Sequence, residues 1–132
     1  MKKRLLLSAL LVLVITVTSF GFVRPNPAKK NVMNRDLVIT NLMNGIESGN
    51  QGLRLSSSYF LGEMKSDEAV IPLMRILKSD QNDEARIMAA LSLIKIGDAR
   101  GIFTIKQAIS FDNSERVKKM CSIFYQYYLS KK

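Results

Sequence analysis

The chain has 132 residues, with 20 basic and 11 acidic side chains and a formal net charge of +9 at pH 7. It contains no histidine and one cysteine, Cys121, which excludes histidine-based acid–base catalysis, histidine metal ligands and an internal disulfide. A chain of this length forms one small domain that is stabilised by packing.

The first 21 residues are typical of an export signal. Residues 2–4 are basic, and residues 5–23 carry no charge and consist mostly of Leu, Val, Ile and Phe. Small residues, Ser19 and Gly21, stand near the end of this stretch. Because an uncharged run of 19 residues nearly spans a bilayer, an uncleaved membrane anchor is the alternative. We therefore expect residues 1–21 to be a signal peptide or an N-terminal inner-membrane anchor, and the protein to be exported to the periplasm or cell envelope.

A linker follows the apolar stretch. Residues 22–33 include Pro25 and Pro27 together with three basic side chains, a composition typical of an extended tether. The folded domain is therefore predicted at residues 34–130.

Residues 34–130 repeat the character of their side chains every 32 residues. The equivalent pairs are 53–54, 85–86 and 117–118, each apolar then basic, and 57–58, 89–90 and 121–122, each small then small. No stretch alternates between polar and apolar residues for long, which argues against strands. A period of this length is typical of stacked helical repeats.

Helical spacing of apolar residues predicts six helices. Their expected ranges are 35–47, 53–64, 67–78, 84–96, 99–110 and 114–129. They form three antiparallel hairpins, the first of which begins with the lone second helix of a truncated repeat. The helix at 84–96 is apolar on most sides, so we expect neighbours on several of its faces.

The joints between helices follow capping chemistry. Gly97 suits the left-handed residue that ends a helix, and Asp98 suits the N-cap of the next one. At the equivalent joint Lys65 has to adopt the left-handed conformation, and Ser66 is predicted as the N-cap. The asparagine or the serine at 113–114 caps the last helix.

The repeated unit resembles a known family. The run "EARIMAALSLIKIGDARGIFTIKQAI" is similar to a bacterial HEAT repeat of the type also seen in phycobilisome lyases. "LRLSSSYFLGEMKSDEAVIPLMRIL" resembles a second copy and "RVKKMCSIFYQYYL" the first helix of a third, so the resemblance covers about residues 37–129. It implies an all-α fold, a short α-solenoid of antiparallel helix pairs (a HEAT-like or armadillo-like superhelix), which chiefly binds other proteins. Lyase activity belongs to longer members of the family.

No constellation of side chains in the sequence is typical of an active site, a metal site or a cofactor site. Cys121 occupies a small-residue core position and has only lysines near it in sequence. The acidic pairs at 67–68 and 83–84 begin helices, where carboxylates stabilise the free N–H groups. We therefore expect no catalytic residue, no metal and no cofactor; the alternative, a lyase-type enzyme, would have to use Cys121, Asp98 and Arg100.

The basic residues that recur at the period are expected to form ion pairs. Arg54, Arg86 and Lys118 each follow the apolar residue that opens a first helix. Acidic residues lie near them in the same turns, at 80, 83, 112 and 115. The alternative is a basic stripe for a partner. Arg100 is expected to form a salt bridge.

Two groups of residues are candidates for a binding surface. By resemblance, second helices line the inner side of a HEAT array, and their polar positions here are Arg75, Lys78, Lys106 and Gln107. The second group consists of the C-terminal aromatic residues Tyr125, Tyr127 and Tyr128, since aromatic side chains with a polar group suit interfaces. The alternative is that residues 124, 125 and 128 only seal the last helix against the others.

The resulting hypothesis is a non-enzymatic HEAT-repeat scaffold or protein-interaction module in the cell envelope. Its basic surplus favours acidic protein partners, and export argues against nucleic acid. An uncapped end of so short an array favours a homodimer. The alternative is a membrane-anchored structural or adaptor protein that contacts the membrane through residues 5–23.

Overall fold

The computed structural model describes residues 34–132, so the signal or anchor expected at 1–21 and the linker expected at 22–33 lie outside the described residues. Within the described part the fold is all-α. No helix between residues 34 and 132 combines the length and the hydropathy that a membrane span requires.

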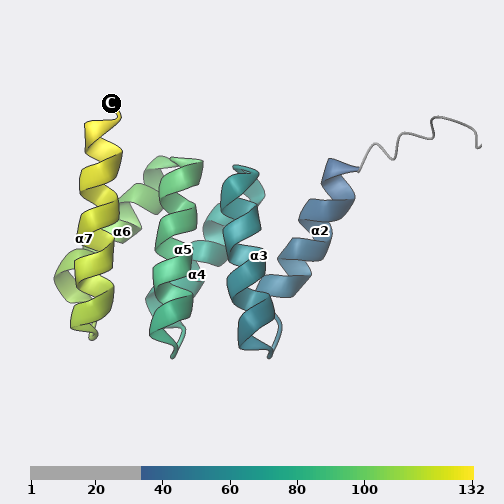
Figure 1. Ribbon diagram of the computed structural model, residues 1–132, viewed down its shortest axis with the longest axis horizontal. Helices are drawn as coiled ribbons and strands as arrows, with labels where there is room; N and C mark the ends of the chain where they lie inside the picture. The colour runs from purple at the N-terminus through teal and green to yellow at the C-terminus, as the bar shows by residue number, and fades with distance from the viewer. Residues whose placement is uncertain (1–33) are drawn as a thin grey trace, which may run out of the picture. The chain divides into compact units, whose positions relative to one another are not determined.

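The described helices follow one another with short joints (Figure 1). They are α2 (Arg35–Ile46), α3 (Gln51–Glu63), the 3-10 turn η1 (Asp67–Ala69), α4 (Val70–Ser79), α5 (Asp83–Ile96), α6 (Ala99–Phe111) and α7 (Glu115–Ser130). No strand occurs between residues 34 and 132. All six predicted helices are therefore confirmed, with ends that differ by at most two residues except at the start of α4, which begins three residues later than predicted.

The helix predicted at 67–78 differs in its first turn, which is the 3-10 turn η1 rather than α-helix. Pro72 has no N–H to donate to the carbonyl of Glu68, and its ring crowds that carbonyl. The α-helical hydrogen-bond pattern therefore starts only at Val70.

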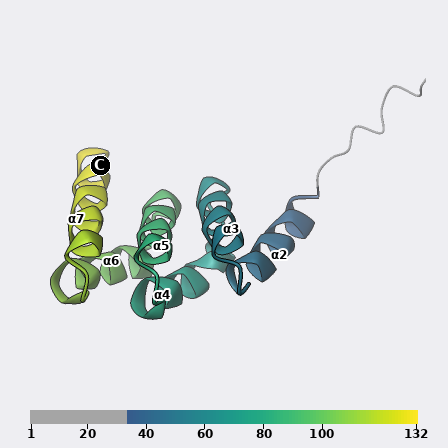
Figure 2. The same ribbon diagram turned by 60° about the horizontal axis from the view of Figure 1, so that its bottom comes forward.

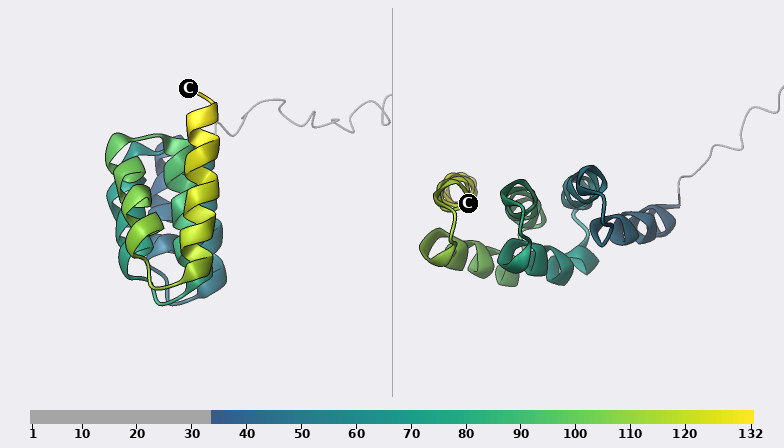
Figure 3. Two further views of the ribbon diagram at one scale, coloured as in Figure 1. Left: turned by 90° about the vertical axis from the view of Figure 1, so that its left-hand side faces the viewer. Right: turned by 90° about the horizontal axis from the view of Figure 1, so that it is seen from below.

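The helices lie in two layers. α3, α5 and α7 run side by side in one layer, and α4 and α6 lie in the other (Figures 2 and 3). α5 contacts α3 and α7 within its layer and α4 and α6 across it. The prediction that the helix at 84–96 has neighbours on several faces is confirmed, and this position explains why its sequence is apolar on most sides.

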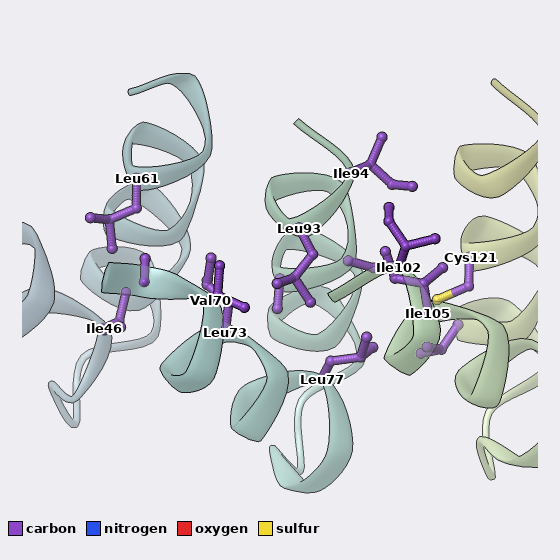
Figure 4. Close-up of a cluster of buried hydrophobic side chains, with 14 of the residues drawn as sticks. Ile46, Leu61, Val70, Leu73, Leu77, Leu93, Ile94, Ile102, Ile105 and Cys121 are labelled. Carbon is purple, nitrogen blue, oxygen red and sulfur yellow. The ribbon is translucent and has the colours of Figure 1, made fainter. Parts of the chain in front are cut away.

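Buried apolar side chains from every described α-helix fill the space between the layers (Figure 4). Those of α7 are Val117 and Cys121. Leu61, Leu73 and Leu93 are fully buried there. Small residues also let α3 and α5 approach closely. The Ser92 hydroxyl donates a hydrogen bond to the Ser58 carbonyl of α3 at 2.7 Å, and a Cβ atom at Gly62 would lie only 2.7 Å from the Ser92 Cα.

The two joints one period apart end their helices in the same way. Gly97 has φ of 80° and Lys65 has φ of 48°, both in the left-handed region, as the sequence predicts. The Asp98 carboxylate caps α6 by accepting the N–H of Arg100 at 2.8 Å. At the start of α7 the cap is Ser114.

The expected Ser66 cap is wrong. Its side chain makes no capping hydrogen bond, and the hydroxyl is buried without a partner among the described residues. The reason is the 3-10 turn that follows, in which the N–H of Ala69 already donates to the Ser66 carbonyl at 3.1 Å.

Candidate functional site

The second-helix face, which we define as the exposed side of α2, α4 and α6, brings together three of the four polar residues predicted for it. Lys78 and Gln107 line one pocket of about 280 Å³ between α4 and α6. Arg75 lies one turn before Lys78, and both line a shallow hollow along α4 with Ile71. The face therefore alternates basic and apolar side chains along the same helix.

A second pocket of about 280 Å³ lies between α2 and α4, where Arg75 stands beside Ile46 and Pro72. The grooves on both sides of α4 thus hold a pocket each. Each pocket mixes apolar and polar side chains, and each includes carboxylates: Glu47 and Asp80 beside Arg75, and Asp112 beside Lys78.

Lys106 lies apart from the other three. Its ammonium nitrogen is 5.8 Å from the centroid of the Tyr125 ring on α7, within reach of a cation–π interaction. Lys106 was predicted for this face because it precedes Gln107 in the same helix. Neighbouring residues of a helix, however, point in directions about 100° apart, so the Lys106 side chain leaves the face.

Phe111 belongs to the second-helix face and was not among the predicted residues. It ends α6, it lines the pocket that contains Lys78, and it is 84% exposed, the largest exposed fraction among the large apolar side chains of the described residues. The signal for it was present in the sequence, because Phe111 follows Gln107 by four residues and therefore lies on the same side of the helix.

The basic side chains of this face have no acidic partner. α4 and α6 contain no acidic residue, and within residues 34–132 neither Arg75 nor Lys78 nor Lys106 forms an ion pair. Three carboxylates cap the ends of these helices: Asp80 and Asp112 are paired with arginines of the other layer, and Asp98 with Arg100 of α6. Arg75 and Lys78 therefore form no ion pair, although the exposed Glu47, which follows α2, lines the same pocket as Arg75.

The C-terminal aromatic residues divide into two groups. Tyr125 and Tyr128 are half-buried and pack against the hydrophobic core together with Phe124, which is the sealing role expected as the alternative. Tyr127 is 58% exposed. It lines a hollow of about 340 Å³ with Tyr128 and Lys95, at the ends of α5 and α7.

The periodic arginines form the ion pairs that the sequence predicts. Arg86, whose side chain is 7% exposed, donates from Nη1 to the Asp80 carbonyl at 2.6 Å and from Nη2 to Asp83 at 2.7 Å. The same guanidinium reaches Asp112 in the following turn, at 3.2 Å. Arg54, one period earlier, pairs with Asp80 at 3.4 Å.

We call this series of guanidiniums and carboxylates the arginine ladder; it consists of Arg54, Asp80, Arg86 and Asp112. Lys118 ends the series, since its ammonium pairs with Glu115 of its own helix at 2.8 Å. Arg54 and Arg86 therefore have a structural role. The alternative of a basic stripe for a partner is wrong for these two residues, because their guanidinium groups are paired with Asp80 and Asp112.

Arg100 makes the predicted salt bridge, and its partner is the N-cap residue of its own helix. Its guanidinium holds Asp98 through two bonds, of 2.9 and 3.0 Å. This pairing lowers the pKa of Asp98 and raises that of Arg100. The Asp98 carboxylate and the Arg100 guanidinium therefore bind each other at the joint between α5 and α6.

Cys121 is fully buried, and burial raises the pKa of its thiol to about 12. A thiol that holds its proton so tightly is a poor nucleophile at neutral pH. Among the described residues, no three cysteine and carboxylate side chains come together in a way that could hold a metal ion.

The acidic pair at 83–84 has structural partners. Asp83 pairs with Arg86 and accepts a hydrogen bond from the Ser114 hydroxyl, and Glu84 pairs with Arg116 of α7. These bonds join the starts of two neighbouring helices and leave no free carboxylate pair there.

Comparison with known proteins gives no family for this chain, since no family model matches it and no curated protein is significantly similar to it.

Proposed function

We propose that the protein is a non-enzymatic HEAT-type scaffold module of the cell envelope that binds a protein partner on its second-helix face. The observation that carries the proposal is a pair of exposed basic side chains, Arg75 and Lys78, that form no ion pair among the described residues. Arg75 and Lys78 stand exposed beside two pockets and an exposed Phe111, on helices without an acidic residue.

The same proposal takes the six helices as a short α-solenoid. It is supported by equivalences one period apart: Lys65 with Gly97 at the joints, and Arg54 with Arg86 in the ladder. In repeat arrays each unit contacts only its neighbours, and the second helices form a continuous surface. A partner would extend along that surface across α2, α4 and α6.

The chemistry of the face defines the partner. A segment that places a carboxylate near Lys78 and a large apolar side chain in the pocket beside Phe111 would satisfy both the charge and the hollow. Charge of this kind mainly accelerates association and selects partners, whereas the buried apolar anchor supplies most of the affinity.

Site-specific photocrosslinking in intact cells tests this proposal. A photoreactive amino acid at position 111 should give an adduct with one defined envelope protein, and the double charge reversal Arg75→Glu with Lys78→Glu should abolish that adduct. The matched control is a photoreactive residue at Ile123, which is 48% exposed on α7, away from the face. Equal adducts from both positions, or none from position 111, would refute a partner on this face.

A membrane-attached adaptor is the second candidate, and the uncharged run at residues 5–23 favours it. N-terminal sequencing of the mature protein separates the two. A start near residue 20 or 22 establishes a released module, whereas an intact N-terminus recovered in the membrane fraction establishes the anchored form.

A further inference from the structure

Three helices of one layer, α3, α5 and α7, end at the same edge of the fold (Figure 1). Their last turns line the hollow of about 340 Å³ that contains Tyr127. We define the α7 tip as the tyrosines and lysines that the end of α7 brings to this edge, together with the neighbouring lysine of α5. Its members are Lys95, Tyr127, Tyr128, Lys131 and Lys132.

The α7 tip combines exposed apolar surface with positive charge. Tyr127 is 58% exposed, and Leu129 in the same last turn is 51% exposed. The ammonium nitrogen of Lys131 lies 5.6 Å from the centroid of the Tyr127 ring. That of Lys132 lies 5.1 Å from the centroid of the Tyr128 ring. Tyrosine rings with a polar hydroxyl, flanked by lysines with long apolar stems, are typical of a surface that meets lipid headgroups.

Positive charge exceeds negative charge at this tip. Glu63 is the only carboxylate among the described residues that line the hollow, and it is paired with Lys95. Lys131 and Lys132 form no ion pair within residues 34–132. Of the other carboxylates at this edge, those at 67–68 follow the joint after α3, and the one at the joint between α5 and α6 is bound by an arginine. The end of α7 therefore attracts anionic headgroups.

The described chain begins at the same edge. Arg35 opens α2, and its guanidinium donates a hydrogen bond of 2.6 Å to the carbonyl of Met64, the C-cap of α3. In the sequence, residues 24–33 connect this point to the uncharged run at 5–23, which is nearly long enough to span a bilayer. A bilayer that held this run would therefore tether the fold by the edge that carries the α7 tip.

We propose that the α7 tip docks on an anionic membrane surface. The ring of Tyr127 lies at the level of the lipid headgroups, and the ammonium groups of Lys131 and Lys132 lie beside the phosphates. Two observations select a lipid surface as the occupant: the lysines beside exposed aromatic surface, and the connection to the apolar run at the same edge. The charge and the rings act whether or not the apolar run is retained.

Docking through this tip leaves the second-helix face accessible. Phe111 ends α6 beside Asp112, in the turn before α7, and so lies at the edge where α7 begins rather than where it ends. The proposal adds a lipid contact to the proposed protein contact, and the two can fail separately.

Unique tryptophans test the docking in the full chain, because the sequence contains no tryptophan. Tyr127→Trp is reconstituted with vesicles of phosphatidylcholine and phosphatidylglycerol that carry brominated acyl chains. Its fluorescence should be quenched and shifted to shorter wavelengths. The matched control is Phe111→Trp, a new tryptophan at an exposed aromatic position of the other edge, which should be neither quenched nor shifted.

Charge removal tests the role of the lysines. In the Tyr127→Trp protein, Lys131→Gln with Lys132→Gln should lower the equilibrium constant for docking by about thirtyfold, since each lysine near an anionic surface contributes about fivefold. Arg75→Gln with Lys78→Gln removes the same charge from the second-helix face and should leave the quenching intact. Thermal unfolding followed by circular dichroism verifies that each variant is folded.

Three results would overturn the proposal. Phe111→Trp could be quenched as strongly as Tyr127→Trp, or vesicles of phosphatidylcholine alone could quench Tyr127→Trp as strongly as anionic ones. A shift of Tyr127→Trp fluorescence without vesicles, growing with protein concentration, would assign the tip to a second copy of the chain.

Discussion

Among single residues, Arg86 joins several segments of the fold through the hydrogen bonds and ion pairs of one guanidinium. Its guanidinium contacts the turn before α5 through Asp80 and the turn before α7 through Asp112. The Asp112 side chain is 7% exposed, as is that of Arg86. A buried ion pair contributes little net stability, but a buried charge left alone is costly.

Replacement of Arg86 by methionine should therefore be strongly destabilising. Arg86→Met keeps the apolar stem of the side chain but leaves Asp112 without its counter-charge, and we expect the free energy of unfolding to fall by about 3 kcal/mol. Urea denaturation measures this change. Arg116→Met removes the arginine of an exposed pair and should have no measurable effect; equal losses in both variants would show that burial is not the cause.

Lys65 occupies a left-handed position that glycine fills one period later, at Gly97. A side chain in that conformation costs about 1 kcal/mol. Lys65→Gly should relieve this strain and raise the free energy of unfolding by about 0.5–1 kcal/mol, since part of the gain is lost to the greater freedom of glycine in the unfolded chain. Thermal and urea unfolding measure the gain. Lys65→Ala is the control that keeps the strain, and it should leave stability unchanged; a gain in that variant would attribute the effect to charge.

Among the helices, the contact between α3 and α5 is set by small residues. The backbones approach so closely that the Ser92 hydroxyl reaches the Ser58 carbonyl across the interface. Gly62 lies opposite Ser92, without space for a Cβ atom. The distance between these two helices thus depends on one glycine and one serine.

The substitution Gly62→Ala should destabilise the protein even though alanine favours helix formation. A methyl group there would lie 2.7 Å from the Ser92 Cα, a backbone atom that moves only with its helix. Overpacking of this kind costs about 1–3 kcal/mol. Gly52→Ala is the control in the same helix, where the nearest atom is 3.4 Å away, and should stabilise by a few tenths of a kcal/mol to about 1 kcal/mol. Urea denaturation compares the two; a stable Gly62→Ala variant would contradict the tight packing.

On the scale of the whole described fold, residues 34–132, the ionisable groups with perturbed pKa values titrate outside the neutral range. The pKa values of Glu63, Glu84 and Asp98 are lowered, chiefly by hydrogen bonds to Lys95, Arg116 and Arg100. Burial raises the pKa of Cys121 to about 12. The sequence has no histidine to titrate between these ranges.

Stability should therefore be nearly constant from about pH 5 to about pH 8. The lowered carboxyl pKa values contribute stability that is present above the ordinary carboxyl pKa and is lost as the pH falls below about 5. The raised thiol pKa acts in the opposite direction, since the unfolded chain releases its proton first and stability falls as the pH rises above about 9. Urea denaturation across this pH series measures the profile, and a slope in the neutral range would contradict it.

The helices and their joints were predictable because the signals are local. Apolar spacing defines α5 and α6, and Gly97 followed by Asp98 defines the joint between them. The recurrence of Arg54 and Arg86 likewise predicted ion pairs that the structure contains.

Other features depend on which element lies opposite, and the sequence does not show this. Lys106 is directed toward Tyr125 because α7 lies beside α6. Phe111 is 84% exposed at the end of α6, and Ser66 lost its cap to the 3-10 turn that Pro72 imposes. The sequence therefore did not predict what these side chains contact, because that depends on the neighbouring elements.

The arginine ladder has a mechanical consequence. It fastens only the edge where the turns before α3, α5 and α7 lie, since Arg54 and Arg86 each clamp two consecutive turns there. At the opposite edge, α3 and α5 are joined by the ion pair of Glu63 and Lys95, which is more exposed and which salt screens readily. The helices are therefore held more stiffly at the edge where the turns before α3, α5 and α7 lie than at the opposite edge. A bound partner would separate the helices at that opposite edge.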